Sequence, residues 1–475
     1  MPNATDRITP DQFQLMFTQI GARSKFYAVP LYVLGSTLTL WAPTVIQALI
    51  TAWLLWVTCT AVLAAARPLS YLRLLVVLTI ATTAPVIVAL LMPDVFAACA
   101  TVAIGLLLTL REALTRPQRA GLVLLLLYSV LVHLTILPIA AGLVVFAAAL
   151  AWFLVPKIPV WRGTATICAV LACAGGIGAI SDMGMRAIFG QDARPPPFLE
   201  GRMMADGPGQ QFLREVCPER HFVACRWKDM NIYYTDDTIW ADVSWHHLPL
   251  ITDPAERRRF LDEQSAFVLG TVMHHPFAQL WASSKNAVKQ LLDFDTSVEI
   301  GGALAGILDL HTARTARVLE TVSNLGPCLT AAGTQACDYR ALFRRVLIPQ
   351  ELVVLGALAV TLVCAVSWLR RPAADQAARH RQRIAAFALI VLAGVILNAV
   401  ICAVVSGPWG RFHARTVWLI PMMAMLLLEN ALQGTGWRVL RWRARAAQAV
   451  PAETDHGTRF VLTAVDLGAR LLRRA

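Results

Sequence analysis

A short basic segment between two long apolar stretches carries the side chains best suited to ligand chemistry. It reads Ser-Gly-Pro-Trp-Gly-Arg-Phe-His-Ala-Arg over residues 406–415 and contains Arg411, His413 and Arg415. A guanidinium forms two parallel hydrogen bonds with a phosphate or a carboxylate, so this segment predicts an anion-binding or lipid-phosphate-binding site. Two structural alternatives stay open. The arginines pair with acidic side chains of residues 182–346, or they extend along the membrane and place their charge among the lipid headgroups.

A second set of candidates lies in a polar segment of the chain, residues 182–346. One interpretation has Arg202 and Asp206 facing a ligand. The alternative is structural, because the Asp-Gly-Pro-Gly sequence that begins at Asp206 is a strong turn signal. It predicts a tight turn with positive φ at Gly209, followed by a helix that ends near residue 216.

Aromatic and acidic residues alternate later in the same polar segment, over residues 227–245. Trp240, Asp242 and Trp245 are predicted glycan contacts, because rings stack on the apolar faces of sugars while carboxylates bind hydroxyl groups. The same residues also fit the core of short strands, or an aromatic belt at the membrane surface.

The sequence predicts neither a metal site nor a cofactor. Two histidine pairs occur, His246-His247 and His274-His275, but adjacent side chains diverge on a helix or a strand, so neither pair forms a site alone. The metalloprotease, phosphate-loop, nucleophile-elbow and dinucleotide-binding motifs are all missing from the sequence. No catalytic residue can be assigned, and whether the protein is an enzyme stays open.

The cysteines divide into two groups. Six of the ten lie in apolar stretches, and the other four form two close pairs in the polar segment, Cys217/Cys225 and Cys328/Cys337. An even number on the oxidising side of a membrane predicts two disulfides. Crossed pairing stays open, since four cysteines allow three connectivities. Zinc is the rival interpretation, although neither pair has the Cys-x-x-Cys spacing typical of zinc sites.

The elements that position these residues are predicted to be membrane-spanning helices. Hydrophobic residues make up 57% of the 475 positions and charged residues 15%, which is far from the balance of a soluble protein. A span needs about 20 apolar residues. Ten such stretches are found: 27–42, 44–66, 72–92, 95–110, 119–136, 137–155, 163–181, 347–369, 385–406 and 414–431.

These spans predict a polytopic α-helical membrane protein with about ten transmembrane helices. A mainly helical domain, with some β structure allowed, is inserted between spans seven and eight. The predicted organisation is an N-terminal cytoplasmic segment 1–26, a seven-span region 27–181, a periplasmic domain 182–346, a three-span region 347–431 and a basic cytoplasmic tail 432–475.

The placement of charge predicts the orientation. The whole chain carries a net charge of +12, yet two thirds of its acidic residues lie in the polar segment. The basic residues concentrate in alternate loops between spans, which predicts that these loops and both termini are cytoplasmic. Abundant Ala and Arg suggest a bacterial origin, so we expect a multi-pass protein of the inner membrane with a periplasmic domain. Nucleic-acid binding is disfavoured, because it would need the basic excess on a folded polar domain.

Arg411-Phe412, followed by Pro421 and an apolar run, resembles the pattern that opens a late span of GT-C-type membrane glycosyltransferases. The resemblance covers about 20 residues and implies an outward-facing site for a sugar carried on polyprenyl phosphate. The chain departs from this family in two ways. The first outward loop, near Pro43, has no acidic residue, so that Asp94 is the nearest outward acid, and a large insert before the eighth span is atypical. The arrangement also resembles multi-span bacterial inner-membrane proteins with a periplasmic insert, which implies no activity.

Three functions are compatible with these patterns. The first is binding or processing of a lipid-linked or polysaccharide substrate at the periplasmic face, with the polar segment as a lid over the Arg411–Arg415 loop. The second is a scaffold or sensor whose periplasmic domain binds another envelope protein. The third is a transporter, disfavoured because the spans contain almost no charge and ion-coupled carriers usually need ionisable groups there. In each case the phospholipid bilayer is the expected surrounding partner.

Overall fold

The computed structural model of this protein describes the chain over residues 24–38, 41–63, 68–153, 160–189, 195–217, 219–239, 254–296, 340–372 and 375–448. Within these ranges every regular element is a helix and no strand occurs. The predicted helical class is thus confirmed for the described residues.

The strands considered for residues 227–245 are absent from the described part of that stretch. Instead, the Asp237 carboxylate accepts hydrogen bonds from the backbone amides of Tyr233 and Tyr234, at 3.0 and 2.9 Å. A side chain that binds nearby amides in this way competes with strand pairing and favours a turn. A short helix, α12 (Asp236–Ile239), follows at once.

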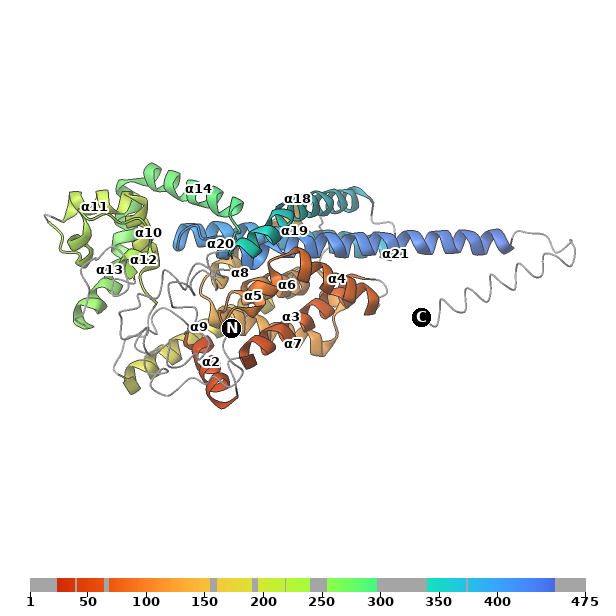
Figure 1. The fold of residues 1–475 in the computed structure, drawn as a ribbon, viewed down its shortest axis with the longest axis horizontal. Helices are drawn as coiled ribbons and strands as arrows, with labels where there is room; N and C mark the ends of the chain where they lie inside the picture. Colours follow the sequence, from red (N-terminus) through yellow and green to blue (C-terminus); the bar gives the residue numbers. More distant parts are fainter. Residues whose placement is uncertain are drawn as a thin grey trace, which may run out of the picture.

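An apolar bundle forms the larger part of the molecule, and Figure 1 shows its longest helices running along the long axis. Its elements are α2 (Lys25–Thr37), α3 (Trp41–Val62), α4 (Pro68–Ala81), α5 (Ala84–Ala89), α6 (Val95–Thr109), η1 (Arg111–Ala113), α7 (Arg116–Val132), α8 (Ile136–Phe153), α9 (Trp161–Phe189), α18 (Arg340–Arg370), α19 (Gln376–Val405), α20 (Gly410–Val417) and α21 (Leu419–Gln448).

Six helical stretches of the described chain are long and apolar enough to cross a membrane. They are Trp41–Val62, Ile136–Phe153, Trp161–Ala187, Gln350–Arg370, Gln376–Val405 and Gly410–Gln433. Three shorter apolar helices accompany them, at Lys25–Leu34, Pro68–Ala81 and Val95–Thr109. Every stretch predicted as a span contains a helix or part of one, while the total of ten crossings stays a prediction.

One predicted span, 72–92, is interrupted. Helix α4 ends at Ala81, and α5 begins at Ala84 with Pro85 in its first turn. Proline lacks an amide hydrogen and clashes with the preceding turn, so a continuous helix cannot pass through this point without loss. At this break, the Thr83 hydroxyl donates a hydrogen bond to the Ala414 carbonyl, at 2.7 Å.

Helices α6 and α19 lie at the centre of the bundle. All fifteen residues of α6 are buried. A Cβ atom added at Gly394 of α19 would lie 2.4 Å from the Thr101 side chain of α6, so the two backbones approach as closely as only glycine permits. Small residues at such crossings are typical of helix packing within membranes.

The polar domain lies at one end of the bundle (Figure 1). Its described elements are α10 (Phe198–Asp206), α11 (Pro208–Val216), η2 (Val223–Trp227), α12, α13 (Pro254–His274) and α14 (Pro276–Leu292). Residues of α10, α11, η2 and α13 form a separate hydrophobic core that includes Phe212, Trp227 and Phe267. The predicted Cys217–Cys225 disulfide is present and joins the end of α11 to η2.

The turn between α10 and α11 differs from the prediction in one detail. Gly207, with φ of 100°, takes the positive-φ position, whereas Gly209 lies inside α11. A residue before proline is pushed out of the right-handed helical region, so the glycine that precedes Pro208 is the one that must adapt.

Several predicted features lie outside the described residues. These are the glycan contacts Trp240, Asp242 and Trp245, the His246-His247 pair, the cysteines Cys328 and Cys337, and most of the terminal segments 1–26 and 432–475. At the predicted domain boundaries the helices are continuous. Helix α9 runs on to Phe189, and α18 already begins at Arg340.

Candidate functional site

A cluster of buried polar side chains surrounds Arg415, near the end of α20. Arg415 is fully buried, with no exposed surface. Its Nε and Nη2 atoms both donate to the Asn398 Oδ1 atom of α19, at 2.9 and 2.7 Å. Its Nη1 atom donates to the Asp94 Oδ1 atom, which lies just before α6, at 3.2 Å. The guanidinium therefore links three helices of the bundle through charged and polar contacts.

The loop between α7 and α8 completes the cluster. Arg415 Nη1 lies 2.8 Å from His133 Nε2, and Arg415 Nη2 donates to Thr135 Oγ1 at 3.0 Å. Because a guanidinium only donates, His133 Nε2 must accept, which places the imidazole proton on Nδ1. Nδ1 lies 2.9 Å from Thr135 Oγ1 and donates to it. His133 is therefore neutral in this arrangement.

These contacts leave Arg415 little capacity for a ligand. A guanidinium has five N–H donors, and all three of its nitrogen atoms are engaged by protein atoms. The predicted role of Arg415 as a direct anion contact is thus less favoured by the geometry than the alternative of an internal ion pair. The acid it pairs with, Asp94, belongs to the bundle and not to the polar domain.

Arg411 lies one helical turn earlier and is much less well paired. Its Nε atom lies 3.8 Å from Asp94 Oδ2, beyond hydrogen-bonding distance, and Nη1 contacts the Met92 sulfur at 3.3 Å. The buried Nε atom has no hydrogen-bond partner among the described residues. The side chain keeps 18% of its surface exposed, and its guanidinium lies over the Phe412 ring at 5.2 Å. Arg411 therefore retains donors that an anion can use.

His413 is enclosed and does not face solvent. It is 4% exposed, and the ring of Phe294, just after α14, packs edge-on against it at a centroid distance of 5.9 Å. Its Nδ1 atom is buried without a hydrogen-bond partner in the described structure. His413 thus contributes to the packing of the polar domain against α20.

The polar domain covers the loop between α19 and α20. Gln290 of α14 exchanges two hydrogen bonds with the Trp409 backbone, one from Nε2 to the carbonyl and one from the amide to Oε1, both at 2.8 Å. Thr235 donates to the Ser406 carbonyl, and the exposed Tyr234 ring lies 5.7 Å from the Trp409 ring. The expected contact between the polar segment and this loop is therefore present.

Arg202 and Asp206 pair with each other inside that contact. Arg202 Nη2 donates to Asp206 Oδ1 at 2.6 Å, and both side chains are buried. Asn286 of α14 also donates to Asp206 Oδ1, at 2.8 Å. The Arg202 guanidinium lies against Gly407, which has φ of 127°, and a Cβ atom added there would be 2.8 Å from Nη1. The geometry thus favours a structural pair that locks α10, α14 and the Gly407 turn together.

Sequence reasoning missed how these residues converge. The sequence identified Asp94 only as the nearest outward acid, and it did not indicate that Asp94 and Asn398 both contact Arg415. Arg415 is the second residue of a predicted span and Asp94 lies between two predicted spans, so this buried pair stands at the edge of the apolar stretches. A transporter stays a disfavoured prediction.

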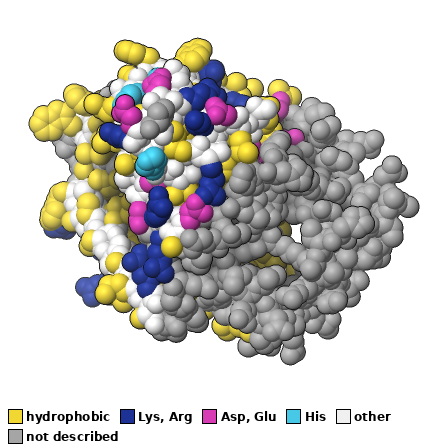
Figure 2. All heavy atoms as spheres, turned by 90° about the vertical axis from the view of Figure 1, so that its left-hand side faces the viewer, with side chains coloured by type: hydrophobic (Ala, Val, Ile, Leu, Met, Phe, Trp, Pro, Cys, Tyr) yellow, Lys and Arg dark blue, Asp and Glu magenta, His cyan; other side chains and the backbone are white. Residues whose placement is uncertain are grey.

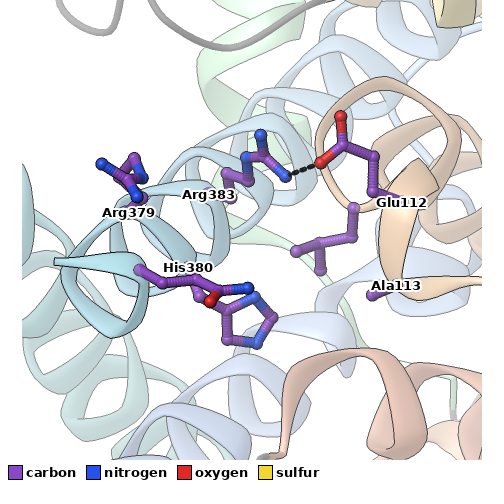
Figure 3. A pocket seen from close by; sticks show the side chains of 7 residues that line it. Glu112, Ala113, Arg379, His380 and Arg383 are labelled. Carbon is purple, nitrogen blue, oxygen red and sulfur yellow. Dashed lines mark hydrogen bonds and ion pairs between the residues drawn. The ribbon is translucent and has the colours of Figure 1, made fainter.

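The opposite end of α19 carries a second basic site, an open cavity of about 390 Å³ (Figure 3). Its lining residues are Leu110, Glu112, Ala113, Gln376, Arg379, His380 and Arg383. Arg383 forms an ion pair with Glu112, which is drawn as a dashed line in Figure 3. A helix of 30 residues is about 45 Å long, so this cavity is remote from Arg411 and cannot contribute to the same site.

The histidine pair of the polar domain shows no metal-ligand geometry. His274 Nδ1 lies 2.8 Å from the Gly270 carbonyl, and His275 Nε2 lies 3.2 Å from a carboxylate oxygen of Glu215. Among the described residues, no three His, Cys, Asp or Glu side chains lie close enough together to hold a metal ion.

Comparison with known proteins gives no match to a family model, to a curated protein or to a solved structure. The resemblance to GT-C-type glycosyltransferases stays a prediction, and the functional argument rests on the geometry of the chain itself.

Proposed function

We propose that this protein is a multi-pass cell-envelope protein that binds a phosphate-bearing, lipid-linked substrate where the polar domain meets the bundle. The observation that carries the proposal is the contrast between two arginines one helical turn apart. Arg415 is buried and fully paired, whereas Arg411 is partly exposed and has a buried Nε atom with no hydrogen-bond partner in the described chain. A phosphate oxygen satisfies such a guanidinium with charge-assisted hydrogen bonds.

The distances to Asp94 support the same assignment. Asp94 lies 3.2 Å from Arg415 but 3.8 Å from Arg411, so Arg411 is the less closely paired of the two arginines. A phosphate diester carries one negative charge and would form a charge-assisted contact with Arg411.

The surroundings of Arg411 fit a substrate with a lipid and a polar part. Trp409 precedes Arg411 by two residues and pairs with the exposed Tyr234 of the polar domain. Such aromatic pairs favour the faces of sugar rings and the membrane interface. The apolar helices next to the Trp409–Tyr234 pair are suitable surroundings for a lipid tail.

The proposed location is the outer face of a bacterial inner membrane. The excess of basic residues in the loops at the Arg379–Arg383 end supports a cytoplasmic position for that end. The Cys217–Cys225 disulfide in the polar domain suits an oxidising compartment. Binding is favoured over sugar transfer, because the Asp94 carboxylate is already held by Arg415 and is poorly placed to act as a base.

The test is mass spectrometry of lipids that copurify with the wild type, with Arg411→Ala and with Arg383→Ala. Arg383 is the matched control, since it is also a partly exposed arginine but lies at the other end of α19. We expect Arg411→Ala to lose a phosphate-containing lipid that Arg383→Ala retains. Identical lipid profiles in the two variants would overturn the proposal. Arg411→Lys keeps the positive charge and is the control for misfolding of the alanine variant. We expect it to retain part of the bound lipid.

A further inference from the structure

Helix α14 has its polar side facing inward. Gln279 and Asn286 both donate to the buried Asp206, and Gln290 binds the Trp409 backbone. The inward-facing positions also include the buried Ala282. An ordinary surface helix of a soluble domain has the opposite arrangement, with its apolar stripe against the core.

The outward side of α14 is apolar and strongly exposed. Phe277 is 84% exposed, Leu280 65%, Trp281 67%, Val288 58% and Leu292 76%. Their spacing places them along one face of the helix over its whole length. At the preceding end of α13, Leu269 and Met273 are exposed as well and extend this surface. A continuous apolar surface of this kind marks an interaction site.

Two observations identify what covers this surface. The first is position: α14 packs beside α19, and Gln290 fixes its end at Trp409, where the last of the six apolar stretches begins. The α14 surface therefore lies next to the helices that are long and apolar enough to cross a membrane, as Figure 1 also shows. Viewed along the bundle, Figure 2 shows charged side chains over the middle of the polar end and hydrophobic side chains at its upper and left edges.

The second observation is the type of residue at the border of the surface. Lys285 lies over the Trp281 ring, 5.9 Å from its centroid, and Lys289 follows one turn later. Tryptophan at the level of the headgroups, with lysines reaching towards the phosphates, is typical of helices that lie at a membrane interface. A contact between two copies of the chain would bury these two lysines, which is unfavourable.

We propose that the outer face of α14 lies in the membrane interface, with Phe277 and Leu292 in contact with the acyl chains, Trp281 at the level of the headgroups, and Lys285 and Lys289 at the phosphates. The polar domain is thereby held against the lipid surface by a helix of its own, in addition to its contacts with the bundle. This inference does not depend on a substrate at Arg411, since it requires only the bilayer around the apolar helices.

Site-specific photo-crosslinking tests the proposal. A benzophenone amino acid replaces Trp281 in one variant and Arg214 in the other, and each full-length protein is reconstituted into nanodiscs of phosphatidylethanolamine and phosphatidylglycerol. Arg214 lies on α11 of the same domain and is about half exposed, which makes it a matched control. Both positions face outward, so the fold tolerates the probe.

We expect phospholipid adducts at position 281, detected by mass spectrometry of the protein, with at least a tenfold lower yield at position 214. Equal yields at the two positions overturn the proposal. A crosslink from position 281 to a second copy of the chain, without lipid adducts, also overturns it and assigns the surface to a protein interface. The result at Arg411 has no influence on this outcome.

Discussion

Positive charge is buried at one end of helix α19 and lines an open cavity at the other. At the end beneath the polar domain, Arg415 is fully buried and its charge is offset by Asp94. At the other end, Arg379, His380 and Arg383 line an open cavity. Charge that stays in water needs no partner, whereas charge inside the bundle needs one at hydrogen-bonding distance. The difference explains how the polar-domain end tolerates Arg415 against the usual charge bias of membrane proteins.

The largest effect is expected from the buried pair. Arg415→Met leaves Asp94 buried without its main partner, and losing one member of a buried ion pair typically destabilises by about 3–5 kcal/mol. We expect a clear fall in the thermal unfolding midpoint of the detergent-solubilised protein. The double variant Arg415→Met/Asp94→Leu removes both charges and should recover part of the loss. If the single variant unfolds like the wild type, the bundle does not depend on this pair.

A buried carboxyl group without a partner is expected to destabilise the fold, so its replacement should raise stability instead of lowering it. Glu200 of α10 is fully buried, and neither of its carboxylate oxygens has a hydrogen-bond partner in the part of the chain that is described. Burial raises the pKa of Glu200 well above its usual value, and the nearby Glu263 raises it further. The fold consequently prefers the protonated form. The stability of the fold therefore falls as the pH rises from the usual pKa of a glutamate through the raised pKa of Glu200.

Glu200→Gln should therefore stabilise the polar domain at neutral pH, because a neutral amide folds without the proton uptake that the Glu200 carboxylate requires. The expected gain is more than about 1 kcal/mol, the free energy of a tenfold change in proton affinity. The gain should shrink towards acidic pH, where the wild-type carboxyl is already protonated. Thermal unfolding measured across pH checks both points. Glu263→Gln is the control, because the Glu263 carboxylate accepts from the Val223 and Ala224 amides, and its loss should destabilise the domain. A gain from Glu200→Gln that is independent of pH would contradict the assignment.

The smallest effect is expected at the open end. Glu112→Gln breaks the ion pair with Arg383, but the Glu112 side chain is 65% exposed. Exposed ion pairs contribute at most about 1 kcal/mol, and salt screens them. We expect the unfolding midpoint to change by less than a few degrees at low salt and not at all at high salt. A loss as large as that of Arg415→Met would remove the contrast between the two ends.

The sequence predicted the positions of the helices better than the contacts between their side chains. Runs of apolar residues mark the spans, because crossing a bilayer demands length and hydrophobicity together. The broken span could have been recognised from Pro85, and the positive φ of Gly207 from the Pro208 that follows it. Both depend on neighbouring residues alone, so the information was local.

The pairing of Arg415 with Asp94 is different, because the two residues are 321 positions apart. The residues adjacent to Arg415 or to Asp94 in the sequence do not indicate that the two side chains pair. The basic segment 406–415 was correctly singled out as unusual, yet the choice between a ligand and an internal acid needed the arrangement of α6, α7, α8 and α19. The same limit applies to α14, whose inverted polarity is evident only from the contacts of Gln279, Asn286 and Gln290.

The pair of hydrogen bonds between Gln290 and Trp409 has a consequence for biosynthesis. The two residues are 119 positions apart, and the helices α18 and α19 lie between them in the chain. A ribosome completes α14 before it synthesises Trp409, so these two hydrogen bonds cannot form until α18 and α19 have also been made. The contact between the polar domain and the loop before α20 is therefore a late one in the synthesis of the chain.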